Sequence, residues 1–260
     1  MAEKTTEDII LERINTAIHN ESDELNLSDL HFDQLPIEIG LVKTLKNLIM
    51  YDCGIVELPS AIGQLSNLEG LYLNGNQLTS LPDEIKNLGN LRDLFLNDNK
   101  FEIFPKEINS LKNLRRLRIR ANRIKQIHHN IWNLKNLETF DIRNNQLTQL
   151  PFQLSQLTKL KYIYLDGNPL PIPPEILEKN NDVAVVLKFY ISFIDVKSSD
   201  PLNKLTSLDN VDISIDVGSL ETKVTSAKTL NEMKLICVGQ GGVGKTSIVR
   251  RSIQGTYNPE

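Results

Sequence analysis

Residues 239–246 have the composition and spacing of a phosphate-binding loop. The segment GQGGVGKT matches the pattern GxxxxGK[ST] in full and ends in Lys245 and Thr246. Glycines allow backbone N–H groups to wrap a phosphate, the lysine reaches the outer phosphates, and the threonine hydroxyl can coordinate Mg²⁺. We therefore expect Thr246 as a metal ligand in a nucleotide site formed by Gly239, Gln240, Gly241, Gly242, Val243, Gly244, Lys245, Thr246 and Ser247.

The flanking segments could position this loop. MKLICVG, at 233–239, is a short apolar run typical of a buried parallel strand. SIVRRSI, at 247–253, predicts a helix that would direct its positive dipole end at the phosphate. Two alternatives remain: a glycine-rich connector with a coincidental Lys-Thr pair, or a weak site for free phosphate or a phosphopeptide.

KLICVGQGGVGKTSIVRR resembles the opening of a Ras-like small GTPase, and QGTYNPE resembles the approach to its first switch. Such a domain needs roughly 160 residues, yet no DxxG, NKxD or catalytic Gln follows Thr246 in this sequence. The resemblance implies GTP or GDP with Mg²⁺ for a complete domain. For this chain alone we expect neither GTP hydrolysis nor tight GTP binding, and the sequence would be either a fragment or a truncated product.

The preceding residues follow a period of 23. Five asparagines share this interval: Asn76, Asn99, Asn122, Asn145 and Asn168. Six prolines keep the same period, with His128 in the one missing place: Pro36, Pro59, Pro82, Pro105, Pro151 and Pro174. The unit reads LxxLxLxxNxLxxLPxxIxxLxN, and alternation such as LYL predicts a short half-buried strand. Such units bury their apolar sides by stacking, which predicts a solenoid with parallel strands along a concave face.

This pattern resembles the leucine-rich repeat family over residues 22 to about 180. The expected fold is α/β: a solenoid of about seven 23-residue repeats with helical caps, then a linker and a truncated P-loop β-α unit. The expected boundaries are 1–21 for an N-terminal helical cap, 22–176 for the repeats, 177–194 for a C-terminal helical cap, 195–231 for the linker and 232–260 for an incomplete GTPase domain. A membrane-surface helix is a rival interpretation of the second cap.

A repeat array followed by a Ras-like domain resembles the Roco family, whose GTPase module is called Roc. The resemblance implies a signalling protein in which a dimerising domain, and often a protein kinase, follows the GTPase. Two functions therefore compete: a protein-interaction scaffold, and a GTPase whose catalytic remainder lies beyond residue 260. Enzyme activity is not expected of this chain alone.

The outward positions of the predicted strands offer a binding surface. They place an aromatic strip of Tyr51, Tyr72 and Phe95 beside a basic patch of Arg116, Arg118, Arg120 and Arg143, with Tyr162 and Tyr164 further along. Aromatic and arginine side chains carry much of the energy of protein interfaces, and arginines bind carboxylates. We expect a protein partner here, and our hypothesis is that an acidic segment of it docks on this surface. The alternative is ordinary solvated positions whose charge is neutralised by Asp93, Asp98 and Asp141.

Charge and composition narrow the remaining classes. The net charge of −4 disfavours nucleic acid, which is the second candidate for the arginine patch. The sequence has no apolar signal core and no apolar run near the length of a membrane span, so a cytoplasmic location is expected. Cys53 occupies an asparagine place in the repeat and is expected to be a buried structural thiol. His128 and His129 lack ligand-type neighbours at metal spacing, and Trp132 is expected to be convex and partly exposed.

Overall fold

A computed structural model describes residues 4–179 and 182–197 of the chain. These residues form helix α1 (Thr6–His19), helices α2 (Pro174–Leu177) and α3 (Val183–Lys197), and between them alternating strands and 3₁₀ helices. The strands are β1 (Glu24–Asn26), β2 (Asn47–Ile49), β3 (Gly70–Tyr72), β4 (Asp93–Phe95), β5 (Arg116–Arg118), β6 (Thr139–Asp141) and β7 (Tyr162–Tyr164). The 3₁₀ helices are η1 (Ile37–Leu41), η2 (Ser60–Gln64), η3 (Asp83–Asn87), η4 (Lys106–Ser110), η5 (His129–Asn133) and η6 (Phe152–Gln156).

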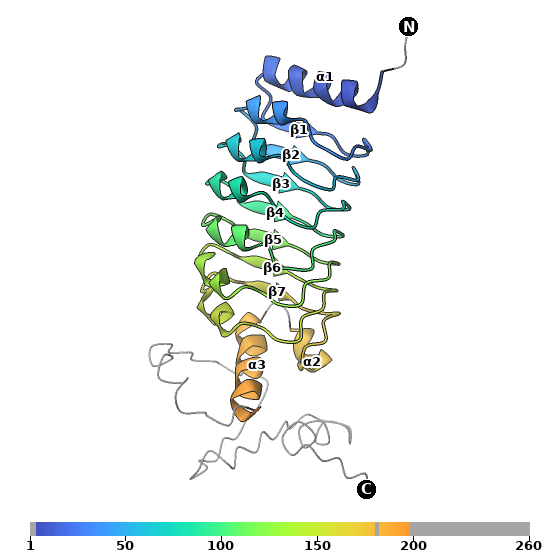
Figure 1. Cartoon of the computed structure of the whole chain (residues 1–260). Coiled ribbons are helices and arrows are strands. Elements are labelled where there is room, and N and C mark those ends of the chain that lie inside the picture. The colour runs from blue at the N-terminus through green and yellow to red at the C-terminus, as the bar shows by residue number, and fades with distance from the viewer. Residues whose placement is uncertain (1–3, 180–181, 198–260) are drawn as a thin grey trace, which may run out of the picture. The chain divides into compact units, whose positions relative to one another are not determined.

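The seven strands form one parallel sheet in sequence order, as Figure 1 shows. Each strand pairs with the residues 23 positions later, so that Leu48 lies beside Leu71 and Leu71 beside Leu94. The middle residue of every strand points inward and is buried, and burial of one such leucine contributes about 1.5–3 kcal/mol. The predicted repeat fold with parallel strands is therefore confirmed.

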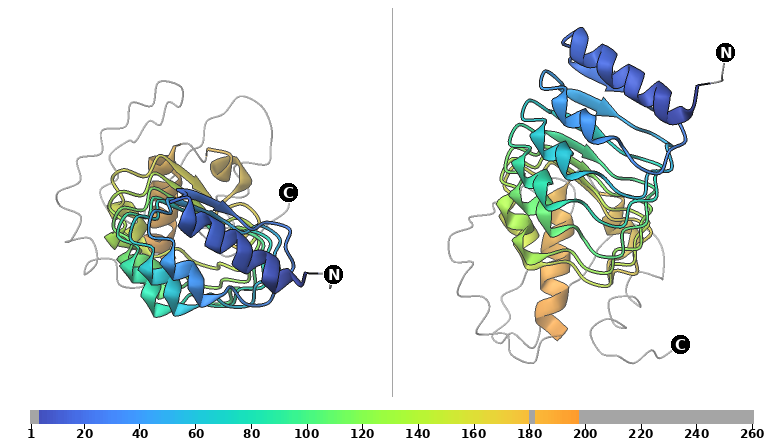
Figure 2. Two further views of the ribbon diagram at one scale, coloured as in Figure 1. Left: turned by 90° about the horizontal axis from the view of Figure 1, so that it is seen from above. Right: turned by 45° about the horizontal axis from the view of Figure 1, so that its top comes forward.

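Helices close both ends of the stack. Thr5 caps α1, accepting a hydrogen bond from the Asp8 backbone N–H, and α1 buries Ile10 and Ile14 over the first coil. Figure 2 shows α1 lying across that coil. At the other end Tyr190 of α3 is 2% exposed, and its hydroxyl accepts a hydrogen bond from the Leu150 N–H at 2.7 Å. This bond satisfies a donor at the end of the array, where no following coil of the described residues could do so.

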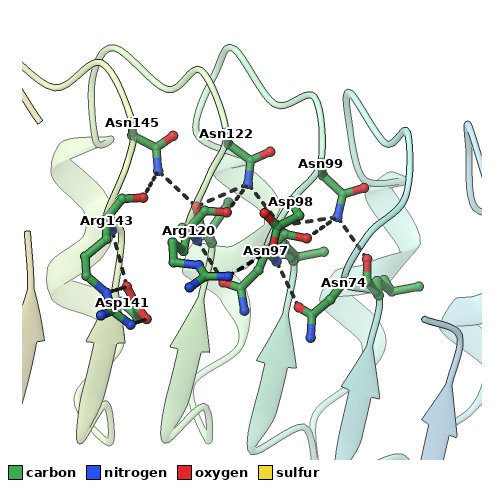
Figure 3. A network of polar contacts seen from close by, with 12 residues as sticks. Asn74, Asn97, Asp98, Asn99, Arg120, Asn122, Asp141, Arg143 and Asn145 are labelled. Atoms are coloured by element: carbon green, nitrogen blue, oxygen red, sulfur yellow. Dashed lines mark hydrogen bonds and ion pairs between the residues drawn. The ribbon is translucent and has the colours of Figure 1, made fainter. Parts of the chain in front are cut away.

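The repeated asparagines form a ladder that is buried except at Asn168, which is half-buried, and part of the ladder is drawn in Figure 3. Asn122 is 8% exposed; its amide donates to the carbonyls of Leu96 and Ile119 and accepts from the Phe101 N–H. The equivalent bonds recur at Asn99, Asn145 and Asn168. Each amide thus serves backbone groups of its own coil and of the preceding one, at the place where the chain leaves the sheet.

Cys53 takes the ladder place in the second coil. It is buried, and its thiol donates to the carbonyls of Leu27 and Tyr51. Burial raises the pKa of the Cys53 thiol to about 11. The side chain is therefore a structural donor that stays protonated at neutral pH, as expected from the sequence.

We expect Cys53 to resist alkylation in the folded protein. Because the pKa is raised, the thiolate is disfavoured on folding, so the contribution of Cys53 to stability is complete below pH 9 and is lost as pH rises through about 11. In a Cys237→Ser background, iodoacetamide at pH 8 should label Cys53 at least 100-fold faster in denaturant than in buffer. Equal labelling rates in the two conditions would contradict the buried placement.

One residue just after each strand adopts a left-handed backbone conformation. These residues also recur every 23 positions: Asp29, Asp52, Gly75, Asp98, Ala121, Asn144 and Gly167. Glycine has no steric cost there, and aspartate and asparagine tolerate the conformation, but alanine does not. Ala121, with φ of 52°, is therefore the least favourable member of the row.

Ala121→Gly should stabilise the protein by about 0.5–1 kcal/mol, because it relieves the left-handed strain at this position. The measurement is the midpoint of thermal or urea unfolding. Ala61→Gly is a contrasting variant, since Ala61 is buried in η2 and should lose stability on the same change. A lower midpoint for Ala121→Gly would show that the strain is absent.

Five of the six repeated prolines lie immediately before 3₁₀ helices, and the sixth, Pro174, is the first residue of α2. Pro59 and Pro82 have φ of −68° and −67°, the value that the ring imposes. His128 replaces proline before η5 with φ of −65°, and its Nδ1 accepts a hydrogen bond from the Asn130 N–H. The missing proline therefore leaves the local geometry unchanged. The predicted GTPase segment 232–260 and the linker from residue 198 onward lie outside the described residues.

Candidate protein-binding face

The first and third residues of each strand face away from the core, on the side of the sheet that we call the concave face. Tyr51, just after β2, Tyr72 of β3 and Phe95 of β4 form the aromatic strip on this face. The Tyr51 and Tyr72 ring centroids lie 6.3 Å apart at 66°, and those of Tyr72 and Phe95 lie 5.1 Å apart at 81°. Such edge-to-face contacts are favourable and fix the rings relative to one another.

The aromatic strip was predicted to be exposed, but its three members are half-buried. The reason is their mutual packing, which covers part of each ring. Burial also raises the pKa of Tyr72 and the pKa of Tyr51. At Tyr51 the positive charge of Arg118 opposes this shift. Both hydroxyls therefore stay protonated at neutral pH and can donate hydrogen bonds to a partner.

Gly70 makes room for the central ring. A Cβ at position 70 would lie 2.6 Å from the Tyr72 hydroxyl oxygen and 2.6 Å from the Tyr72 Cε2 atom. The Tyr72 ring therefore lies over Gly70, in space that a side chain fills at the equivalent position of the other coils. The sequence pattern did not single out Gly70, although it is the one glycine in the row Glu24, Asn47, Gly70, Asp93, Arg116, Thr139 and Tyr162.

Three of the four predicted patch arginines are ion-paired. Arg116 binds Asp93 through two hydrogen bonds, which raise the pKa of Arg116. Arg143 binds the buried Asp141 at 2.9 and 2.7 Å, and this likewise raises the pKa of Arg143. The third pair, Arg120 with Asp98 at 3.2 Å, lies beyond the end of the strands and is drawn in Figure 3.

Arg118 differs from these three. Its guanidinium lies over the Phe95 ring, 4.6 Å from the centroid, and among the described residues no carboxylate lies within salt-bridge distance of it. Asp141 is its neighbour in the sheet register, but both Asp141 oxygens bind Arg143. The predicted basic patch is therefore largely neutralised, and Arg118 retains a charge that points to solvent.

The structure brings together only part of the predicted partner-binding set. Tyr51, Tyr72, Phe95 and Arg118 are contiguous, and Arg116 adjoins them at 5.9 Å from the Phe95 centroid. Tyr162 and Tyr164 stack separately on β7, where Arg143 lies 5.0 Å from the Tyr164 centroid. Asp93, which the sequence suggested only as a neutralising charge, fixes Arg116. The 23-residue offset from Arg116 is the signal that identifies this pair.

The other candidate residues lie elsewhere. His128 and His129 stack on each other, and in the described part of the chain no three metal-ligating side chains cluster. Trp132 is 39% exposed on η5, with the Lys135 ammonium 4.8 Å from its ring centroid. The predicted nucleotide-binding residues, Gly239 to Ser247, lie outside the described residues. None of the helices in residues 4–179 and 182–197 has the length and hydrophobicity needed to cross a bilayer.

Comparison with known proteins identifies the repeat. A sequence model of the leucine-rich repeat region matches residues 24–130 and 99–238, which together exceed half of the chain. The chain belongs to the leucine-rich repeat family. Leucine-rich repeat domains are typical of protein–protein interaction. Comparison with curated proteins found no match.

Many solved structures are similar to this chain. A leucine-rich repeat protein of Leptospira interrogans is 40% identical with a TM-score of 0.56, and the match covers 58% of this chain and 38% of that one. PEPR1 in the PEPR1–AtPEP1 structure is 32% identical with a TM-score of 0.50, over 56% of this chain and 21% of that one. The leucine-rich repeat ectodomain of the membrane receptor kinase GASSHO1/SCHENGEN3 from Arabidopsis thaliana is 29% identical with a TM-score of 0.49, over 56% and 18%. The matched region thus spans well under half of each of these proteins.

Proposed function

We propose that this chain is a protein-interaction scaffold that binds a partner protein on the concave face of its leucine-rich repeats. The observation that carries the proposal is the contiguous set formed by the aromatic strip and Arg118. Aromatic and arginine side chains often dominate interface energies, and in the described part of the chain Arg118 has no carboxylate partner. Their fixed geometry also reduces the entropy lost on binding.

The similarity to PEPR1 supports this proposal, since PEPR1 was solved together with AtPEP1. The rest of the surface offers less. Exposed apolar side chains such as Ile103 and Phe152 are scattered over different coils, whereas the aromatic strip is continuous. A partner that bound the concave face would cover the strip and Arg118 together.

The experiment compares the wild-type chain with a Tyr72→Ser/Phe95→Ser variant as baits in quantitative interaction proteomics. At least one protein should be retained by the wild type and lost by the variant, and should bind the wild type again when purified. Trp132→Ala is the matched control, because it removes an aromatic side chain from η5 and should keep every such partner. If both variants retained all the partners of the wild type, the concave face would not be the binding surface.

A finer role rests on the sequence motif at residues 239–246 and not on geometry, because these residues lie outside the described part of the chain. We propose that the scaffold belongs to a cytoplasmic signalling protein of Roco type, in which the motif begins a GTPase domain. Lys245 would bind the nucleotide phosphates and Thr246 the Mg²⁺ ion in the complete domain. The support is the full match to GxxxxGK[ST] after an apolar run.

Titration with a fluorescent GTP analogue in Mg²⁺ tests this role. The 260-residue chain should bind with a Kd weaker than about 100 μM, because the sequence predicts only one strand, one loop and one helix for the 29 residues from 232. A longer product of the same gene that contained DxxG and NKxD should bind at micromolar concentration or tighter, and Lys245→Ala should abolish binding. Tight binding by the 260-residue chain that survived Lys245→Ala would assign the nucleotide to another site.

A further inference from the structure

The charge balance of the concave face restricts the chemistry of its partner. Three of the patch arginines have a carboxylate at 3.2 Å or closer. The pairs are Arg116 with Asp93, Arg120 with Asp98 and Arg143 with Asp141. Of the four arginines in the patch, Arg118 is the one for which the described residues supply no carboxylate. A run of acidic residues would meet one available guanidinium and three ion pairs without net charge, so only one of its carboxylates would find a free cation on this patch.

Arg118 is prepared for one carboxylate. The Cζ atom of Arg118 lies over the Phe95 ring, 4.6 Å from the centroid, and the side chain is exposed, so its N–H groups remain available to a partner. A guanidinium held in this way can bind a carboxylate through two parallel hydrogen bonds, and little side-chain entropy remains to be lost. Asp141 cannot take this place, because its two oxygens already bind Arg143.

The aromatic strip fixes what must accompany that carboxylate. The rings of Tyr51, Tyr72 and Phe95 run from the end of β2 to β4, and Arg118 continues the line on β5. Four neighbouring strands span about 14 Å, since parallel strands lie about 4.8 Å apart. About four residues of extended chain cover this distance. The partner thus needs its bulky apolar side chain and its carboxylate within about four residues of each other.

We propose that the concave face binds an extended protein segment with one isolated Asp or Glu, which pairs with Arg118, and an aromatic or large aliphatic side chain within four residues of it, which packs on Tyr51, Tyr72 and Phe95. This inference rests on the proposed function and adds the chemical class of the partner. It replaces the acidic run with a single carboxylate, and it assigns Gly70 the positioning of Tyr72.

Selection from a display library of random 12-residue peptides, with the 260-residue chain as bait, tests the proposal. The enriched peptides should contain one acidic residue within four positions of a bulky apolar residue. For a synthetic enriched peptide, Arg118→Ala should weaken binding about tenfold, and Arg118→Lys should weaken it several-fold because the planar fork is lost. Arg123→Ala is the matched control: Arg123 is exposed and 3.8 Å from Glu102, and binding should not change.

A double-mutant cycle shows whether the carboxylate contacts Arg118. Replacement of the peptide's acidic residue by its amide should weaken the affinity about tenfold for the wild-type chain and leave the affinity for the Arg118→Ala variant unchanged. Gly70→Ala should weaken binding several-fold with Arg118 intact, because the new Cβ displaces the Tyr72 ring. Each variant is first checked by thermal unfolding, so that only folded proteins are compared.

The outcomes separate the two proposals. Peptides that depend on Tyr72 and Phe95 but show additive losses in the cycle, or that carry acidic runs, would overturn the single-carboxylate inference and leave the proposed function standing. A selection without any peptide that depends on Tyr72 and Phe95 would count against both. Displacement of an enriched peptide by a single-stranded oligonucleotide would assign the face to nucleic acid and likewise overturn both.

Discussion

We expect Asn76→Ala to lower the free energy of unfolding by about 3–5 kcal/mol, the largest effect of any ladder substitution. Asn76 is 5% exposed, and its Oδ1 accepts from two backbone N–H groups, those of Cys53 and Ile55. Its Nδ2 is also the donor to the Met50 carbonyl at 2.8 Å. In the described residues these three groups have no second partner. The Met50 carbonyl lacks one because the Cys53 thiol, which takes the ladder place in that coil, donates to Leu27 and Tyr51 instead. Urea unfolding followed by circular dichroism measures the loss.

The same substitution two coils later, at Asn122, should lower the free energy of unfolding by less. Asn122→Ala removes a donor to the Leu96 and Ile119 carbonyls, but Asn99 and Asn145 also donate to these carbonyls. The Phe101 N–H is the main group left without a partner, so the expected loss is about 2 kcal/mol. Asn113→Ala is the surface control: Asn113 is exposed, makes one bond to the Gly89 carbonyl, and should cost less than about 1 kcal/mol. Equal losses for Asn76→Ala and Asn122→Ala would show that the cysteine in the second coil leaves no gap in the ladder.

The repeat architecture could be predicted because many positions carry the same requirement in every coil. An inward leucine, a buried amide and a proline before each turn recur at 23-residue intervals, so one exception does not hide the pattern. His128 is such an exception, and its backbone adopts the φ that proline would impose. The 3₁₀ form of the turns was not predicted, because five-residue segments such as DEIKN carry no periodicity that separates it from other turns.

The binding face was only partly predictable, because its chemistry depends on pairs of side chains. The alternation along the strands identified the outward-facing residues. The contact between Tyr72 and Phe95 follows from the 23-residue interval, which places them side by side on neighbouring strands. The charge state of the patch did not follow from a list of arginines. Arg116 and Arg118 differ by two residues, yet one is bound to Asp93 and the other lies on a ring without a carboxylate partner in the described structure. Rotamer choice decides between these two states, and sequence spacing does not specify it.

Gly63→Ala should destabilise the protein by about 1–3 kcal/mol, because the turns η2 and η3 touch at this position. A Cβ on residue 63 would lie 2.5 Å from the Glu84 carbonyl oxygen, 2.6 Å from the Glu84 Cβ and 3.0 Å from the Glu84 carbonyl carbon. Two of these atoms are backbone, so relief requires the two coils to move apart rather than a side chain to rotate. The later coils carry Lys86, Asn109, Trp132 and Ser155 at the equivalent positions, which indicates that close approach is a property of the first turns.

Gly89→Ala is the matched control for this prediction. Gly89 is exposed, and a Cβ there would meet no atom within 4 Å, so the variant should unfold within about 0.5 kcal/mol of the wild type or be slightly more stable. The difference between the two variants isolates the contact of η2 with η3 from the general effect of replacing glycine. If both glycines could be replaced without loss, the coils would have room to separate, and stability would come from the sheet and the asparagine ladder alone. A loss confined to Gly63→Ala would instead show that the turns limit how far the first coils can spread, and hence the curvature of the face that carries Tyr51 and Tyr72.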